Sequence, residues 1–300
     1  MLPSFIGIGA PKAATTWLFR CLQEHPDVYM APVKETKFFD DEHIEGRMGE
    51  YEAHFVGAGC AKAVGEISVR YLASQRGAAE RIRKCLPDVR LFVSLRNPID
   101  QVYSHYWHLQ RQNFHHAYNS HLPLSFEQSL ERFPQELLGP ASYGTQLETW
   151  LAHFDRQQLL VLFYDEICAD PAAVVQQLYD FLGVDATFVP VSLHQKGIDV
   201  RTGTSPIGRW AERLHARVYD GLCRIVYSPL KKAIGSWAAE KVKNSLHVRQ
   251  AMEKLFRRPG YPPMRQATRH HLQCLFDQEI RKVERLTGCE LSRWRQPASD

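Results

Sequence analysis

The chain has 300 residues, 44% of them hydrophobic and 23% charged, as in an ordinary globular protein with a sizeable core. These values exclude disordered, fibrous and disulfide-stapled classes. The seven scattered cysteines, without a Cys-x-x-Cys pair, indicate a reducing compartment and disfavour a zinc site. A net charge of +4 is too small for a protein that wraps nucleic acid, although it allows a local basic pocket.

The start of the chain does not have the pattern of a targeting segment. Its first ten residues are apolar, but Pro11 and Lys12 interrupt the run and no basic segment precedes it. Nowhere do about 18 apolar residues run together, which predicts that no helix spans a membrane. The expected location is therefore the cytoplasm.

Strands and helices are predicted to alternate through the first two thirds of the chain. Short apolar runs bounded by turn residues predict buried strands at 5–9, 63–67, 89–95 and 159–164. Helical patterns lie between and beside them at 15–24, 75–85, 98–110, 142–154 and 171–182. This alternation implies crossover connections and a parallel sheet covered on both faces. The predicted fold class is therefore a three-layer α/β/α arrangement.

The last third of the chain has a different pattern. Between 206 and 286 no segment is predicted to be a strand, and amphipathic helices are expected near 206–226, 229–246 and 266–286. No repeat or long linker divides the chain. The prediction is one domain over 1–300, with an α/β core over 1–200 and a helical part over 201–300.

The turn between the first strand and the first helix carries the clearest chemical signal. Its small residues precede a helix N-terminus, where unpaired backbone N–H groups can close around an oxyanion. Lys12 adds a cation, and Thr15 and Thr16 add hydroxyl donors. The turn is not a nucleoside-triphosphate loop, because its lysine comes three residues before Thr15 and no second glycine precedes it in frame. Taken alone, the turn is also compatible with a tight strand–helix connection that binds nothing.

The segment 11–17, Pro-Lys-Ala-Ala-Thr-Thr-Trp, resembles the 5′-phosphosulfate loop of sulfotransferases that use 3′-phosphoadenosine 5′-phosphosulfate (PAPS). A second motif supports this resemblance, since the strand at 89–95 runs into Arg96-Asn-Pro and Ser104 follows eight residues after the arginine. In that family the arginine and the serine hold the 3′-phosphate, and an arginine at the carboxyl edge of a parallel strand is suited to that contact. The resemblance covers nearly the whole chain and is weakest at about 205–260.

The resemblance implies a set of residues that bind the donor nucleotide. Lys196-Gly197 resembles the family's late Lys-Gly segment, but its neighbour is Gln195 where the family often has an arginine, so Arg201 is an alternative ligand. Trp17 either packs near the adenine or anchors its helix to the core. The implied donor-binding residues are Pro11, Lys12, Ala13, Ala14, Thr15, Thr16, Trp17, Arg96, Ser104, Lys196, Gly197 and Arg201.

Two residues are implied to act on the transferring group. Lys12 is expected to stabilise the bridging oxygen as the nucleotide leaves. In carbohydrate-type members, a glutamate in a Gly-Glu-x-Ser/Thr-x-x-Tyr setting is the general base, and Glu66 matches that position in 65–71. Glu66 is otherwise a structural carboxylate that pairs with Arg70 or Lys34.

Two further catalytic candidates follow from the same resemblance. Segment 34–39, Lys-Glu-Thr-Lys-Phe-Phe, looks like the family's Lys-Glu-x-x-x-Phe-Phe stretch, whose lysine faces the sulfonate, and Lys34 is otherwise a solvated surface lysine. The rival base is a histidine, because members that act on phenols and steroids use one in the middle of the chain, and His105 lies on the helix predicted after Arg96. His105 and His108 share a helix face, but their spacing matches no metal signature.

The predicted function is that of a PAPS-dependent sulfotransferase. It would move the sulfuryl group to a hydroxyl of a glycan or a small molecule and release adenosine 3′,5′-bisphosphate, with no metal required. The alternative is a P-loop-type nucleotide kinase or another nucleoside-triphosphate enzyme, for which Asp165 or Glu166 is a weak candidate for the magnesium-binding carboxylate. No nucleic-acid partner is expected, and no pattern encodes the acceptor or the oligomeric state.

Overall fold

The computed structural model describes residues 2–111, 124–194, 204–206 and 257–296. The chain divides into two compact units, and each is described by itself. The first comprises Met1–His105, Ser129–Ile198 and Met264–Asp300, and the second comprises Tyr106–Gln128 and Asp199–Pro263. The expectation of a single domain over 1–300 stays a prediction.

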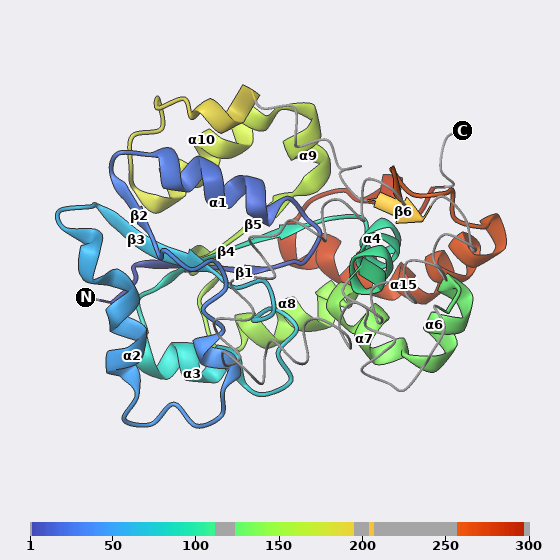
Figure 1. The fold of residues 1–300 in the computed structure, drawn as a ribbon, viewed down its shortest axis with the longest axis horizontal. Helices are drawn as coiled ribbons and strands as arrows, with labels where there is room; N and C mark the ends of the chain where they lie inside the picture. Colours follow the sequence, from blue (N-terminus) through green and yellow to red (C-terminus); the bar gives the residue numbers. More distant parts are fainter. Residues whose placement is uncertain (1, 112–123, 195–203, 207–256, 297–300) are drawn as a thin grey trace, which may run out of the picture. The chain divides into compact units, whose positions relative to one another are not determined.

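The first unit is built on a five-stranded parallel sheet with the strand order β2–β3–β1–β4–β5 (Figure 1). β1 (Phe5–Gly9) lies between β3 (Ala63–Ile67) and β4 (Arg90–Leu95), and β2 (Val28–Met30) and β5 (Leu159–Phe163) form the two edges. Ile6 of β1 stands opposite Glu66 of β3. Because all strand pairs are parallel, their carboxyl ends meet at one edge of the sheet, where ligands of such folds bind.

Helices cover both faces of this sheet (Figure 1), which confirms the predicted α/β class. On one face lie α1 (Thr15–Glu24), α9 (Tyr164–Ala169) and α10 (Pro171–Leu182), and on the other lie α3 (Ala78–Cys85) and α8 (Tyr143–Leu151). α15 (Gln266–Thr287) packs along α8. The other α-helices of the described residues are α2 (Met48–Glu52), α4 (Pro98–Arg111), α6 (Phe126–Arg132) and α7 (Pro134–Leu138).

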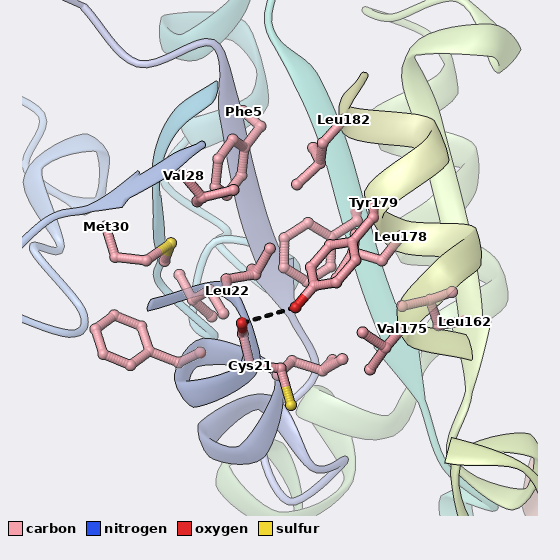
Figure 2. Packing of buried hydrophobic residues seen from close by; sticks show 14 of the residues in the cluster. Phe5, Cys21, Leu22, Val28, Met30, Leu162, Val175, Leu178, Tyr179 and Leu182 are labelled. Atoms are coloured by element: carbon pink, nitrogen blue, oxygen red, sulfur yellow. Dashed lines mark hydrogen bonds between the residues drawn. The ribbon is translucent and has the colours of Figure 1, made fainter. Parts of the chain in front are cut away.

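The core beneath α1 and α10 fixes the start of α1 relative to the sheet. Figure 2 shows the packing of Leu22, Val175, Leu178 and Leu182 from the helices with Phe5, Val28, Met30 and Leu162 from the strands. Full burial of each such side chain stabilises the fold by about 1.5–3 kcal/mol. The Tyr179 hydroxyl donates to the Cys21 carbonyl oxygen at 2.8 Å and ties α10 to α1. The turn that precedes α1 therefore projects from a rigid base.

Several predicted elements have the bounds that the structure shows. β1, β3, α1 and α10 match residue by residue, whereas the structure shortens the predicted strand at 159–164 to Leu159–Phe163. β2 was not predicted, because three residues are too short for a period of two to be recognised. In β3, a Cβ on Gly65 would lie 2.5 Å from the Phe5 carbonyl oxygen. Glycine there permits the close approach of β3 to β1 immediately before Glu66.

The second unit corrects the expectation that 206–286 contains no strand. β6 (Thr204–Pro206) pairs antiparallel with β7 (Arg257–Pro259), and Ser205 stands opposite Arg258. Each strand has three residues and includes a proline, so neither has a recognisable alternating pattern.

Of the helices predicted in the last third of the chain, the one at 266–286 is present as α15, while those near 206–226 and 229–246 lie outside the described residues. No helix in the described ranges is both long and apolar enough to cross a bilayer.

Candidate active site

The turn between β1 and α1 is lined by backbone rather than by capping side chains. Lys12 and Ala14 have φ angles of 67° and 61°, in the left-handed region, and Ala14 is the N-cap of α1. No side chain caps this helix start, and its first turn contains no acidic residue. Left-handed turn residues before a helix direct successive N–H groups toward one point, and the helix dipole adds positive potential there. The turn is therefore suited to a phosphate or sulfate group.

Three hydrogen bonds hold this turn against β4 and the helix that follows it. The Ala10 N–H donates to the Ser94 carbonyl oxygen at 2.8 Å, and Gln101 Nε2 donates to the Pro11 carbonyl oxygen at 3.2 Å. Arg96 Nη1 donates to the Lys12 carbonyl oxygen at 3.3 Å. Two motifs that are 84 residues apart in the chain are thus in contact.

Arg96 is also held from its other side. Its guanidinium carbon lies 4.8 Å from the centre of the Tyr164 ring, a cation–π contact that orients the planar group. Burial raises the pKa of Tyr143, and the positive charge of Arg96 partly offsets that rise. Arg96 is therefore placed by an aromatic ring and by the turn, at the carboxyl edge of β4.

The other predicted donor-binding residues are distributed as follows. Ala13 and Thr15 are buried, Pro11 is half-buried and Thr16 is exposed. Ser104 is buried on α4, and His105 beside it is half-buried. Trp17 belongs to the hydrophobic core, and its indole N–H donates to the Ser192 carbonyl oxygen at 3.0 Å. Lys196, Gly197 and Arg201 lie outside the described residues.

Glu66, the predicted general base, has no exposed surface and is surrounded by hydroxyl groups. Its Oε1 accepts from the Tyr51 hydroxyl at 2.9 Å and from the Tyr71 hydroxyl at 3.2 Å. Its Oε2 accepts from Ser68 Oγ at 2.7 Å, from Thr36 Oγ1 at 2.7 Å and from the Thr36 N–H at 3.3 Å. Burial and then the charge of Glu66 raise the pKa of Tyr51 and of Tyr71, so both phenols stay protonated donors.

The two cations considered as structural partners of Glu66 pair with other carboxylates. Lys34 Nζ lies 3.0 Å from Glu35 Oε1, and Arg70 Nε lies 3.3 Å from Asp40 Oδ2. The alternative interpretation, a Glu66 ion pair with Lys34 or Arg70, is therefore contradicted, because neutral hydroxyls already occupy the carboxylate. Lys34 is half-buried, with 22% of its side chain exposed.

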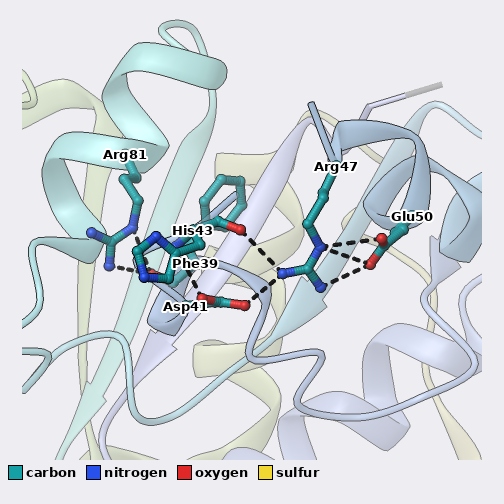
Figure 3. A network of polar contacts seen from close by, with 6 residues as sticks. All are labelled: Phe39, Asp41, His43, Arg47, Glu50 and Arg81. Atoms are coloured by element: carbon teal, nitrogen blue, oxygen red, sulfur yellow. Dashed lines mark hydrogen bonds and ion pairs between the residues drawn. The ribbon is translucent and has the colours of Figure 1, made fainter. Parts of the chain in front are cut away.

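A polar network on the rim holds the segment that supplies Tyr51. Figure 3 shows the Arg47 guanidinium between Asp41 and Glu50, with Nη1 2.6 Å from Asp41 Oδ2 and Nη2 2.9 Å from Glu50 Oε2. The backbone N–H of His43 and then Arg47 lower the pKa of the Asp41 carboxyl. The Phe38 ring stacks on Tyr51 with centroids 4.9 Å apart. Segment 38–51 is thereby fixed over Glu66.

Sequence reasoning missed two of the groups that contact Glu66. Tyr51 and Thr36 lie 15 and 30 residues before it, on α2 and on the segment after β2. No spacing rule links either residue to Glu66. Ser68 and Tyr71 belong to the motif that pointed to Glu66, and that motif was the available signal. In the described part of the chain, no group of three or more His, Cys, Asp or Glu side chains could hold a metal ion.

Comparisons with known proteins agree with these motifs. Residues 3–198 match the family model described as the sulfotransferase domain. Two relatives are the bifunctional heparan sulfate N-deacetylase/N-sulfotransferases 4 of Mus musculus and 3 of Homo sapiens, 28% identical over 199 residues and 30% identical over 200 residues. Each alignment covers 61% of this chain and 22% of the relative. A crystal structure of a sulfotransferase from Alicyclobacillus acidocaldarius matches with a TM-score of 0.68 and 25% identity, over 99% of this chain and 100% of that one.

Proposed function

The chain belongs to the sulfotransferase family of enzymes, and from this premise we propose that it moves a sulfuryl group from PAPS to a hydroxyl of a glycan or a small molecule. The products are the sulfate ester and adenosine 3′,5′-bisphosphate. The observation that carries the proposal is the contact between the uncapped turn before α1 and Arg96, since it brings together the two segments that we propose to bind the phosphates.

The described residues fit a nucleotide with phosphate groups at two positions. The turn with Lys12, Thr15 and Thr16 would hold the 5′ end, while Arg96 and Ser104 would hold the 3′-phosphate. Two buried polar atoms without a hydrogen-bond partner, Ser94 Oγ and Gln101 Oε1, belong to residues that contact this turn. Buried polar atoms are rarely left unpaired in folded proteins, so these atoms support a polar ligand nearby. Lys196, Gly197 and Arg201 are proposed as further ligands.

Lys12 and Lys34 are proposed to offset the charge that develops during transfer. The donor supplies a sulfuryl group that passes between two oxygens in line, with negative charge on its remaining oxygens and on the departing phosphate. Lys12 lies on the turn that would hold that phosphate and would stabilise the departing oxygen. Lys34 would exchange its contact with Glu35 for the sulfonate oxygens.

Glu66 is proposed as the general base in preference to His105. Its carboxylate accepts hydrogen bonds from four hydroxyl groups, and within the described residues no lysine or arginine pairs with it. A cation in contact would stabilise the charged form and weaken the base. The hydroxyl donors instead hold the carboxylate in one orientation, which a proton acceptor needs.

A titration tests the donor site against the kinase alternative. Calorimetry with adenosine 3′,5′-bisphosphate, and separately with ATP and Mg²⁺, should give tight binding of the bisphosphate without a metal. Binding of ATP with Mg²⁺ and none of the bisphosphate would favour the P-loop kinase interpretation and overturn the proposal.

A transfer assay tests the acceptor. ³⁵S-labelled PAPS is offered with a neutral oligosaccharide, a simple phenol and N-desulfated heparan, and release of inorganic sulfate to water is followed in parallel. The last acceptor carries free amines, and it is included because the heparan sulfate relatives are N-sulfotransferases by name. Transfer to hydroxyls supports the proposal, while transfer confined to the amine polymer would replace the hydroxyl acceptor by an amine.

A further inference from the structure

We propose that Thr36 is a catalytic residue whose hydroxyl relays the proton of the acceptor to Glu66. The inference rests on the proposed function, because it takes Glu66 as the base. It adds that the acceptor touches Thr36 rather than the carboxylate itself.

Among the described residues that donate to Glu66, burial leaves one that an acceptor can contact. Glu66, Tyr51 and Ser68 have no exposed surface, and Tyr71 is 1% exposed. Thr36, in contrast, is partly exposed. Of the described residues that donate to Glu66, Thr36 is thus the one that an acceptor in solution can reach.

Backbone hydrogen bonds hold the segment that carries Thr36, so the Thr36 hydroxyl is expected to stay against Glu66 when an acceptor binds. Three successive backbone N–H groups donate to the end of β3 and the residue after it. Glu35 N–H donates to the Ile67 carbonyl oxygen at 3.0 Å, Thr36 N–H to Glu66 Oε2 at 3.3 Å and Lys37 N–H to Ser68 Oγ at 3.3 Å. Glu35 and Lys37 have φ angles of 68° and 58°, and these left-handed turns set the direction of the residue between them.

The hydroxyl of Thr36 has the hydrogen-bonding capacity that a relay needs. It donates its single proton to Glu66 Oε2 at 2.7 Å and keeps two lone pairs. The Phe38 N–H approaches one of them at a long 3.4 Å. The Tyr71 hydroxyl, 3.2 Å away, can give its proton to Glu66 Oε1 instead. One lone pair is then open to the hydroxyl of an acceptor.

The proposed step moves two protons while one bond forms and another breaks. The acceptor O–H proton passes to Thr36 Oγ1 as the Thr36 proton passes to Glu66 Oε2. The acceptor oxygen uses its electron pair to bond to sulfur, and the bond from sulfur to the bridging phosphate oxygen breaks with its electrons on the nucleotide. Glu66 is left protonated and returns its proton to water by the reverse route through Thr36.

Ser68 provides a matched control. Its hydroxyl donates to the same oxygen of Glu66 at the same 2.7 Å, but it is fully buried. Thr36→Val keeps the shape of the side chain and removes the hydroxyl, while Thr36→Ser keeps the hydroxyl. The single-turnover rate with ³⁵S-labelled PAPS is measured for each variant with the acceptors named above and with water. Calorimetry with adenosine 3′,5′-bisphosphate checks that the donor site is intact.

The relay predicts that Thr36→Val lowers the transfer rate by about 10²–10³-fold, within the range for general base catalysis, with bisphosphate affinity unchanged. Thr36→Ser should stay within about tenfold of the wild type, and Ser68→Ala should lose about tenfold or less, as expected for one positioning hydrogen bond. When the wild-type rate is measured in mixtures of H₂O and D₂O, its plot against the deuterium fraction should be curved, because two protons move together. The same plot for Ser68→Ala should be curved as well.

Different outcomes contradict the relay and the proposed function. Equal rates in Thr36→Val and Ser68→Ala, or a straight isotope plot for the wild type, overturn the relay while the sulfotransferase activity stands. The isotope plot decides by itself if Thr36→Val does not fold. A wild type that binds no bisphosphate and transfers label neither to an acceptor nor to water overturns the proposed function, and the relay with it.

Discussion

Two regions at the carboxyl edge of the sheet carry opposite charge in different surroundings. The turn before α1 presents backbone N–H groups and brings Arg96 to the main chain of Lys12. The pocket of Glu66 holds a single negative charge among hydroxyl groups, with no exposed surface on the carboxylate. Binding a highly charged nucleotide requires fixed positive potential, whereas proton transfer requires a carboxylate that no cation neutralises. The contrast fits the proposed roles, donor binding at the turn and proton transfer at Glu66, at one edge of one sheet.

Glu66→Gln is expected to have the largest effect, because it removes the charge of one region and leaves the other intact. The transfer rate should fall by about 10²–10⁴-fold, the contribution of a general base. The affinity for adenosine 3′,5′-bisphosphate should not change, and circular dichroism should show a folded protein. A parallel measurement on His105→Asn ranks the two candidate bases. A normal rate in Glu66→Gln together with a large loss in His105→Asn would move the base to the histidine.

Lys12→Ala tests the opposite region. Loss of a cation that stabilises the departing oxygen should lower the transfer rate by about 10²–10³-fold, similar to the removal of one oxyanion donor. The melting temperature should stay near that of the wild type, since Lys12 is half-buried on a turn rather than packed in the core. An unchanged single-turnover rate would show that the turn binds the donor without taking part in transfer.

The sequence predicted the turn before α1 better than it predicted the pocket of Glu66. β1 and α1 flank the turn, and a short apolar run and a regular helical pattern predicted them. Arg96 follows directly from the end of β4. Two of the four hydroxyl donors of Glu66, Thr36 and Tyr51, have no local pattern that connects them to it, so only the folded chain reveals them.

The interpretations that the structure contradicts have a similar physical origin. Arg70 and Lys34 were the alternative partners for Glu66 by charge, but each pairs with another carboxylate, Asp40 and Glu35 respectively. A rule that pairs residues by charge cannot anticipate that neutral hydroxyl groups, rather than a cation, donate to the buried carboxylate of Glu66. The strand β7 was missed because three residues give no periodicity.

Arg96→Lys sharpens the comparison, because it keeps the positive charge beside the turn before α1 and changes the geometry of the donor groups. Lysine cannot provide two parallel donors to a phosphate, and it lacks the planar group that lies over Tyr164. The affinity for adenosine 3′,5′-bisphosphate should fall by about tenfold, or about 1.4 kcal/mol. Calorimetry with adenosine 5′-monophosphate is the control, because a ligand without a 3′-phosphate should bind both proteins equally. A similar loss for both ligands would show that Arg96 acts on the turn and not on the 3′-phosphate.

The smallest expected effect concerns segment 38–51, which supplies Tyr51 to the pocket of Glu66. Asp41 has a lowered pKa, from the His43 N–H and then Arg47, so its stabilising contribution is full above its ordinary pKa and is lost as the pH falls through the lowered value. Acidification should therefore loosen segment 38–51, which carries Tyr51, before it affects the turn at 10–16. Amide hydrogen exchange measured between neutral and acid pH checks this order. Asp41→Asn should speed exchange in 38–51 at neutral pH and show a smaller further change on acidification, which comes from Glu50, since Arg47 lowers the pKa of that carboxyl too. Equal acceleration in both segments would mean that the two regions share one rigid unit, and that the contrast between them lies in their ligands alone.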